Sequence, residues 1–185
     1  MGQSAVPHDW VGVVLAGGAS RRMGADKALI EVGGRPMVTR VADALRVAGC
    51  DPVVVQGGDR DRIGALGLTV WADAQPGAGP VAALSSILER LDRPVVIAAC
   101  DLPDLDGITV ETVIAEADAH PELVAVAAAV DGRPAMVSAW RPSARAHLPS
   151  PNGMSYRSAL AAVGALLVPI DAGPVKNVNT VADLG

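Results

Sequence analysis

Residues 15–27, LAGGASRRMGADK, combine residue types that suit the binding of a phosphate group. Gly17 and Gly18 allow positive φ angles and a close approach of backbone N–H groups to an anion. Arg22 and Lys27 add positive charge to a chain whose net charge is −5, and arginine can bind phosphate through two parallel hydrogen bonds. The residues alone favour an anion-binding turn over a solvated basic turn that opens a helix.

Two common phosphate-binding motifs do not match this stretch. The Rossmann fingerprint requires G-x-G-x-x-G, whereas Gly17 and Gly18 are followed by Ala19. The P-loop requires G-x-x-x-x-G-K-[ST], whereas Gly24 is followed by residues 25–27, ADK. The stretch therefore suits an anion without belonging to either of these two classes.

Short strand-like runs alternate with helical patterns along the chain. β-branched apolar runs predict strands at residues 11–15, 52–56, 68–72, 95–100, 123–130, 135–140 and 166–170. Apolar residues on one helical face predict helices at residues 36–48, 81–91, 109–118, 156–163 and 180–184. The Asp131-Gly132 pair predicts a hairpin turn between two of the strands. This alternation is typical of an α/β fold with a mostly parallel sheet covered on both faces.

The loops that follow predicted strands are the best candidates for a binding site. In open α/β sheets, ligands bind outside the carboxyl ends of the strands, at the point where the strand order reverses. Four segments meet this condition and should face one crevice: residues 16–27, 56–59, 73–80 and 101–104.

Composition narrows the class of protein. The chain has 185 residues, half of them hydrophobic, so we expect one domain over residues 1–185 with a flexible N-terminus at 1–9. The acidic net charge gives no general reason to expect nucleic acid or an acidic membrane as partner. Cys50 and Cys100 are expected to be buried thiols. The sequence contains no apolar run of about 18 residues, so it predicts no membrane span. We expect a cytoplasmic protein.

The first loop resembles a family signature. LAGGASRRMGADKAL matches LAGG-x-x-x-RMG-x-DK-x-L, the signature of the nucleotidyltransferase family that contains molybdenum cofactor guanylyltransferase, at every fixed position. Further blocks similar to those of the family follow in family order: GRPMVTRVADAL, ADAQPGAGP, AACDLPDL and VKNVNTVADL. Together the five blocks span residues 11–184.

The resemblance implies a fold and a reaction. The fold is a three-layer Rossmann-like nucleotidyltransferase fold with a mostly parallel central sheet. In the implied reaction, a terminal phosphate of molybdopterin attacks the α-phosphate of GTP, pyrophosphate leaves, and molybdopterin guanine dinucleotide forms. Such a displacement relies on positioning and charge stabilisation rather than on a covalent nucleophile. His8, His120 and His147 are isolated and are expected at the surface.

The resemblance also implies which residues hold the nucleotide. Lys27 and Arg22 would neutralise the triphosphate and the leaving pyrophosphate. Asp73 would contact the nucleoside, with a turn or cap role as its alternative. Gln56 stands where relatives often carry asparagine, and both contact and no contact with the base remain open. The implied nucleotide-binding residues are Leu15, Ala16, Gly17, Gly18, Lys27, Gln56, Asp73, Gly79 and Asn179.

Mg²⁺ is the implied cofactor and Asp101 its implied ligand. Mg²⁺ in proteins usually takes one or two carboxylates together with substrate phosphates and water. Asp101 follows the strand predicted at 95–100, so its carboxylate should emerge at the carboxyl end of that strand. The alternative is that Asp101 only shapes the turn before Leu102-Pro103. Asn177 and Asn179 would line the side of the site nearer the acceptor.

Two departures from the family pattern leave the substrates open. Ala83 stands where many members have glycine, and Arg133-Pro134 stands where His-Pro is common. The closest rival is cytidylyl transfer to the same pterin, against which Gly17 favours guanine because cytidylyl relatives tend to read LAAG. Transfer to a sugar phosphate and nucleotide binding without turnover are further alternatives. We expect a monomer or weak oligomer, acting alone or docked to a molybdoenzyme or its chaperone.

Overall fold

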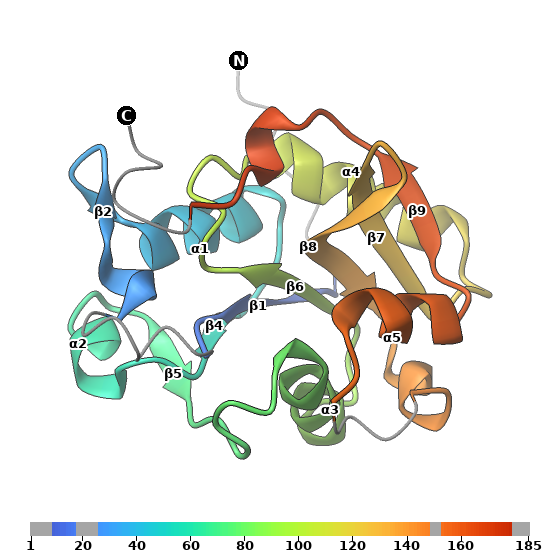
Figure 1. The fold of residues 1–185 in the computed structure, drawn as a ribbon, viewed down its shortest axis with the longest axis horizontal. Helices are drawn as coiled ribbons and strands as arrows, with labels where there is room; N and C mark the ends of the chain where they lie inside the picture. The colour runs from blue at the N-terminus through green and yellow to red at the C-terminus, as the bar shows by residue number, and fades with distance from the viewer. Residues whose placement is uncertain (1–8, 18–25, 149–152, 179–185) are drawn as a thin grey trace.

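The computed structural model describes residues 9–17, 26–148 and 153–178. Within them, a seven-stranded sheet has the strand order β5-β4-β1-β6-β8-β7-β9 (Figure 1). Neighbouring strands pair in parallel except at β8, which is antiparallel to both β6 and β7. The strands are β1 Val11–Leu15, β4 Val53–Gln56, β5 Thr69–Trp71, β6 Val95–Ala99, β7 Ala125–Val130, β8 Arg133–Trp140 and β9 Leu166–Pro169. All seven predicted strands are confirmed, with bounds shifted by at most two residues.

Helices cover both faces of the sheet. Figure 1 shows α1 and α4 on one face and α3 and α5 on the other, which gives the expected three layers. The α-helices are α1 Met37–Val47, α2 Arg60–Gly64, α3 Pro80–Arg90, α4 Gly107–Ala119 and α5 Tyr156–Ala162. Four predicted helices are confirmed, and the fifth, at 180–184, lies outside the described residues. A search of the described residues finds no helix with the length and apolar character needed to cross a membrane.

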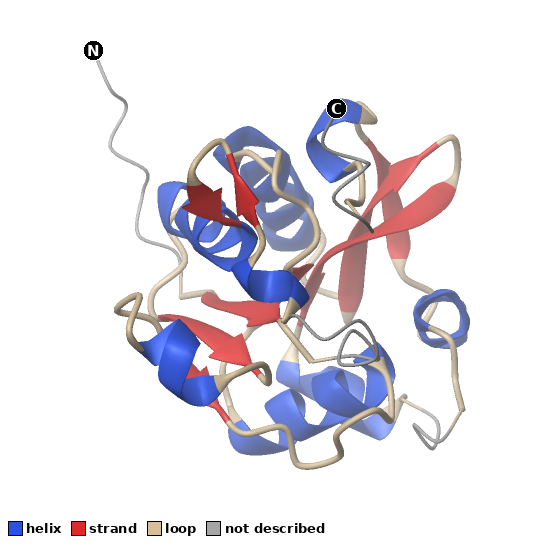
Figure 2. Cartoon of the chain, turned by 60° about the vertical axis from the view of Figure 1, so that its left-hand side comes forward, coloured by secondary structure: helices blue, strands red, loops and turns tan. Residues whose placement is uncertain are grey.

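The sequence pattern missed the shortest elements. α2 has five residues, of which only Ile63 is buried, so it has no amphipathic period to detect. The small antiparallel ladder of β2 (Glu31–Val32) and β3 (Arg35–Pro36) joins the first loop to α1. Figure 2 shows these two strands apart from the main sheet.

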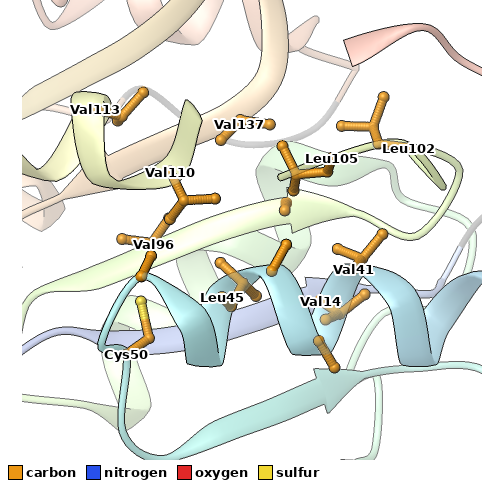
Figure 3. Close-up of a cluster of buried hydrophobic side chains, with 14 of the residues drawn as sticks. Val14, Val41, Leu45, Cys50, Val96, Leu102, Leu105, Val110, Val113 and Val137 are labelled. Carbon is orange, nitrogen blue, oxygen red and sulfur yellow. The ribbon is translucent and has the colours of Figure 1, made fainter. Parts of the chain in front are cut away.

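Side chains along each strand point alternately to the two faces of the sheet, and a hydrophobic core forms on each face. On β1, Val13 and Leu15 face the layer of α3 and α5, whereas Val14 faces the layer of α1 and α4. In Figure 3, Leu45 of α1 lies among the buried side chains on the α1–α4 face. Because both faces are buried, β1 and β6 are nearly continuous hydrophobic runs, as parallel strands in such sheets usually are.

Polar side chains fix where several helices begin. The Asp106 carboxylate accepts a hydrogen bond from Thr109 N at 2.8 Å and so caps the start of α4. Ser155 caps α5 in the same way through Ser158 N, at 3.1 Å. Such caps satisfy backbone N–H groups that have no partner within the helix.

The predicted hairpin joins β7 to β8. Val130 pairs with Arg133 across a two-residue turn, in which Asp131 has φ 50° and Gly132 φ 71°. Two positive φ angles are the signature of the turn type that matches the twist of the strands. Further along β8, a buried network anchors α5, because Trp140 Nε1 and the Tyr156 hydroxyl both donate to Ser138 Oγ, at 2.6 and 2.7 Å.

The topology places four strand ends at one edge. β1, β4, β5 and β6 are parallel, so the loops that follow Leu15, Gln56, Trp71 and Ala99 open on the same side. The chain builds the sheet outward from β1 to β4 and β5, then returns to place β6 on the other side of β1. The strand order therefore reverses between β1 and β6, where ligand sites of such sheets form.

Shortening Leu45 should destabilise the fold. The Leu45 side chain is fully buried between α1 and the sheet, so Leu45→Ala leaves a cavity and should lower the free energy of unfolding by about 2–5 kcal/mol. Val47→Ala is the control, because Val47 lies on the same helix and is 62% exposed; it should change stability by about 0.5 kcal/mol or less. Urea denaturation measures both, and equal losses would contradict the packing described.

Candidate functional site

Lys27 and Asp101 meet across the point where the strand order reverses. Lys27 Nζ lies 2.8 Å from Asp101 Oδ2, and the two side chains are 14% and 20% exposed. Lys27 begins the 3-10 helix Lys27–Leu29, which follows the first loop. Asp101 follows β6 and is held to β1 through its neighbour, because Cys100 N donates to Leu15 O at 3.0 Å. Two opposite charges are thus held together where water screens them only partly.

The second carboxylate oxygen of Asp101 has no hydrogen-bond partner among the described residues, although it is buried. A buried polar atom in this state is costly, and a bound cation is one way to satisfy it. The described residues contain no group of three His, Cys, Asp or Glu side chains that could enclose a metal ion. One carboxylate with an oxygen that has no hydrogen-bond partner among the described residues fits Mg²⁺, which keeps water and substrate phosphates as its other ligands.

Two other segments brace the turn that carries Asp101. From α1, Arg40 Nε donates to Pro103 O at 2.7 Å, and its guanidinium lies 3.6 Å from Asp104 Oδ1. From the C-terminal segment, Val178 N donates to Asp101 O at 2.9 Å. The second contact brings Asn177 and its neighbours alongside the Asp101 turn.

The turns after β1, β4 and β5 touch each other through backbone. A Cβ atom built on Gly57 would lie 3.0 Å from both Cα and N of Gly17, and one on Gly17 would lie 2.9 Å from Asp73 Oδ2. Hydrogen bonds follow the same path, since Ala16 N donates to Gln56 O at 3.0 Å and Gly57 N to Trp71 O at 2.9 Å. Side chains at the two glycines would hold these turns apart.

Gln56 and Asp73 are tied to this edge through the loop after β5. Gln56 is 4% exposed, and its amide nitrogen donates to Ala72 O at 3.2 Å. Asp73 Oδ1 accepts from Gln75 N at 3.1 Å, so Asp73 has the turn-shaping role considered as an alternative, while Oδ2 lies beside Gly17. Contact of Gln56 with a base stays a prediction.

The predicted site residues mostly lie at one edge. The structure brings together Leu15, Ala16, Gly17, Lys27, Gln56, Asp73 and Asp101, through the contacts described above. Gly79 lies at the far end of the loop that follows Asp73, where it precedes Pro80 at the start of α3. Gly18, Arg22 and Asn179 lie outside the described residues.

Asp26 is not among the nucleotide-binding or metal-binding residues that the family resemblance implies. In the structure, Asp26 Oδ2 accepts from Asp59 N at 2.7 Å and Oδ1 from Ala28 N at 3.1 Å. The neighbouring arginines of the first loop lie outside the described residues. Asp26 is a fixed residue of the signature, which was the one available signal, whereas nothing in the pattern connects it to Asp59, 33 positions along the chain.

The cysteines are not candidates for catalysis. Both thiols are free and buried, as predicted. Burial, with smaller contributions from the Asp101 and Asp26 carboxylates, raises the pKa of Cys100 to about 12, and burial raises the pKa of Cys50 to about 12. A thiol needs a lowered pKa to act as a nucleophile near neutral pH, so neither cysteine meets the requirement.

Comparison with known proteins places this site in a family. A family model described as the MobA-like NTP transferase domain matches residues 12–166. The chain belongs to the MobA-like NTP transferase family. The match to the family contains the Gly17 turn, Lys27, Gln56, Asp73, Gly79 and Asp101.

Individual relatives in this family carry a consistent name. A Rhodobacter capsulatus protein named molybdenum cofactor guanylyltransferase is 33% identical over 183 residues, which are 94% of this chain and 92% of that protein. A protein of the same name from Xanthomonas euvesicatoria pv. vesicatoria is 39% identical over 100 residues, which are 53% of this chain and 50% of that protein. The chain spans about half the length of several curated relatives that it matches, the Xanthomonas protein among them.

A solved structure shares the fold of this MobA-like chain. The structure of molybdopterin-guanine dinucleotide biosynthesis protein A from Archaeoglobus fulgidus matches with a TM-score of 0.66 and 19% identity, over 94% of each chain. This match supports the three-layer architecture and the mixed sheet.

Replacing Gly57 should lower the free energy of unfolding by more than backbone strain alone accounts for. Gly57→Ala puts a side chain at φ +81° and brings it to the backbone of Gly17. Gly77→Ala is the matched control, because Gly77 has φ +85° and nothing within 4 Å of a Cβ atom. Positive φ costs about 1–2 kcal/mol in either variant, so Gly57→Ala should lower the free energy of unfolding further. Chemical denaturation measures the difference, and equal losses would contradict the close approach of the turns.

The two thiols should resist modification in the folded protein. A pH of 8 is far below the raised pKa of about 12 that each thiol has, and both thiols are buried. The reactive thiolate is therefore scarce and inaccessible. An aromatic disulfide reagent should react slowly with the native protein and rapidly with both thiols after unfolding in urea. Fast release of one equivalent from native protein would contradict the burial of Cys50 or Cys100.

Proposed function

We propose that the chain transfers GMP from GTP to molybdopterin, releases pyrophosphate and forms molybdopterin guanine dinucleotide, with Mg²⁺ as cofactor. The observation that carries the proposal is the Lys27–Asp101 pair at the reversal of strand order, 2.8 Å apart, in a chain of the MobA-like NTP transferase family. The names of the relatives support the choice of substrates. The proposal places the reaction in the cytoplasm, with a monomer or weak oligomer as the working form.

Lys27 would bind the phosphates of GTP. Its ammonium group is a compact point charge of the kind that proteins use on triphosphates. The exposed turn at Gly17 offers backbone without a side chain in the way. In the bound state the triphosphate would replace Asp101 as the partner of Lys27, so the positive charge remains balanced throughout.

Asp101 would hold Mg²⁺ through the carboxylate oxygen that has no hydrogen-bond partner among the described residues. When bound, the ion supplies neutralisation of the negative charge on the triphosphate and on the leaving pyrophosphate. Asp101 is suited to this because its turn is fixed by Arg40 and by Val178 N. A rigid carboxylate holds its charge in place before the substrate arrives, which is the basis of electrostatic preorganisation.

The reaction needs no general base from the protein. A phosphate monoester has a second pKa of about 6. The terminal phosphate of molybdopterin is therefore mostly a dianion at neutral pH, and its attacking oxygen has no proton to lose. One of its oxygens forms a bond to the α-phosphorus of GTP, and the bond from that phosphorus to the β-phosphate oxygen breaks. Pyrophosphate leaves with the electron pair. The residues at this edge therefore have to align the two phosphates and hold charge.

The approach of Gly17 to Asp73 favours GTP over CTP. Cytidylyl relatives tend to carry alanine at the position of Gly17, and a Cβ atom there would lie 2.9 Å from Asp73 Oδ2. Asp73 would have to move in such a protein. In this chain it can stay beside Gly17, where we propose that it contacts the nucleoside, with Gln56 and Gly79 lining the base and Asn179 on the acceptor side.

Nucleotide binding provides the first test. Thermal unfolding is measured with GTP, CTP and ATP, each with and without Mg²⁺. A ligand at a hundred times its Kd adds about 2.7 kcal/mol, which corresponds to a shift in Tm of about 5–10 °C for a chain of this size. We expect the largest shift with GTP and Mg²⁺. A larger shift with CTP would support cytidylyl transfer instead.

Turnover provides the second test. With molybdopterin and GTP, pyrophosphate release should require Mg²⁺, and Asp101→Asn should lower kcat/KM by at least about a hundredfold, because it removes the charge at nearly constant shape. Asp92→Asn is the control, since the Asp92 side chain is 95% exposed and Asp92 precedes β6, at the opposite end of the strand from Asp101. Activity retained in Asp101→Asn, with chelator-resistant turnover, would contradict the assignment of the metal ligand.

A further inference from the structure

Asp26 joins two turns that the chain brings together from different strands. Its Oδ2 atom accepts from Asp59 N, which belongs to the turn after β4, at 2.7 Å. Its Oδ1 atom accepts from Ala28 N, one residue beyond Lys27, at 3.1 Å. Hydrogen bonds from backbone N–H groups to an ionised carboxylate are among the stronger ones in proteins. A single side chain therefore fixes the end of the first loop to the turn after β4.

The turn after β4 is shaped to receive Asp26. Gly58 has φ +81°, and a Cβ atom on it would lie 3.4 Å from Asp26 Oδ2, 3.2 Å from Ala16 Cβ and 2.5 Å from Ile63 Cδ1. A residue with a side chain would therefore have to push Ile63 aside, and its Cβ atom would lie in contact with the Asp26 carboxylate. Glycine at this position lets the backbone of the turn lie directly against the Asp26 carboxylate.

Asp26 also caps the short helix that begins at Lys27. Lys27 is the first residue of a three-residue helix, and Asp26 is the N-cap of that helix. A helix this short has little intrinsic stability, so its orientation depends on the cap and on what the cap is tied to. The lysine side chain has several rotatable bonds, and ordering it is favourable only if its backbone is already fixed.

We propose that Asp26 is a positioning residue that fixes Lys27 opposite Asp101 by bridging the end of the first loop to the turn after β4. The use of Lys27 on the triphosphate rests on the proposed function. Asp26 itself need not touch substrate. It acts through Lys27, and losing it should affect nucleotide binding only as far as Lys27 contributes to that binding.

A double-mutant cycle separates this role from a purely structural one. GTP affinity in the presence of Mg²⁺ is measured by calorimetry for the native protein, Asp26→Ala, Lys27→Ala and the double variant. Asp26→Ala should weaken binding by about tenfold, the factor that corresponds to 1.4 kcal/mol. In the Lys27→Ala background the same change should have little further effect, because coupled residues are not additive. Equal effects in both backgrounds would overturn the proposal.

Asp59→Ala is the matched control. The Asp59 carboxylate caps α2 by accepting from Arg62 N at 3.1 Å, so its removal also deletes an aspartate cap nearby. The variant keeps the Asp59 backbone N–H that Asp26 binds. It should lower stability without changing GTP affinity. A loss of affinity as large as that of Asp26→Ala would show that general loosening of this edge, not the bridge, is responsible.

Two readouts do not depend on nucleotide. In Asp26→Ala, the amide of Asp59 should lose hydrogen-exchange protection, and a crystal structure of the ligand-free variant should show Lys27 displaced from Asp101. Asp26→Asn, which keeps one acceptor oxygen, should give intermediate exchange. If the native protein binds no nucleotide, the proposed function fails while these readouts still test the bridge. A Lys27 Nζ that stays 2.8 Å from Asp101 Oδ2 in Asp26→Ala would overturn the proposal.

Discussion

The ion pair between Lys27 and Asp101 is the constraint on which this edge of the molecule depends. Each charge is mostly shielded from water, at 14% and 20% exposed, and a charge held in this way needs a partner. In the absence of ligand each residue is the partner of the other. A ligand that enters must therefore bring a replacement for both, which an anionic phosphate and a cation do together. Under the proposed function, GTP and Mg²⁺ would supply these two replacements together.

Close backbone contact delivers the two charges to the same place. Lys27 follows β1 and Asp101 follows β6, and these strands pair directly along five residues of each. On the other side of β1, the turn after β4 lies against Gly17 without room for a side chain. The turns can approach this closely because glycine residues and backbone atoms make the contacts between them. The separation of the turns is therefore set by the distance between strands rather than by the size of side chains.

The sequence predicts the fold well and the site in part. Strands such as Val95–Ala99 are buried on both faces and therefore appear as uninterrupted apolar runs. The Asp131-Gly132 turn is local, so a short pattern identifies it. Arg40 is different, because it braces a carbonyl group 63 residues away, at Pro103. Backbone donors and acceptors leave no trace in the identity of the residue that carries them, and the hydrogen bond from Asp59 N to the Asp26 carboxylate escapes prediction for the same reason.

β8 is the one strand of the seven-stranded sheet, among the described residues, that runs against its neighbours. Because of this reversal, the chain passes from β7 to β8 through a two-residue turn, which opens at the same edge as the loops that carry Lys27 and Asp101. Residues added to or removed from a hairpin tip need not disturb the pairing of β1 with β6. The tip of the β7–β8 hairpin can therefore change in length while the strands that deliver Lys27 and Asp101 keep their pairing.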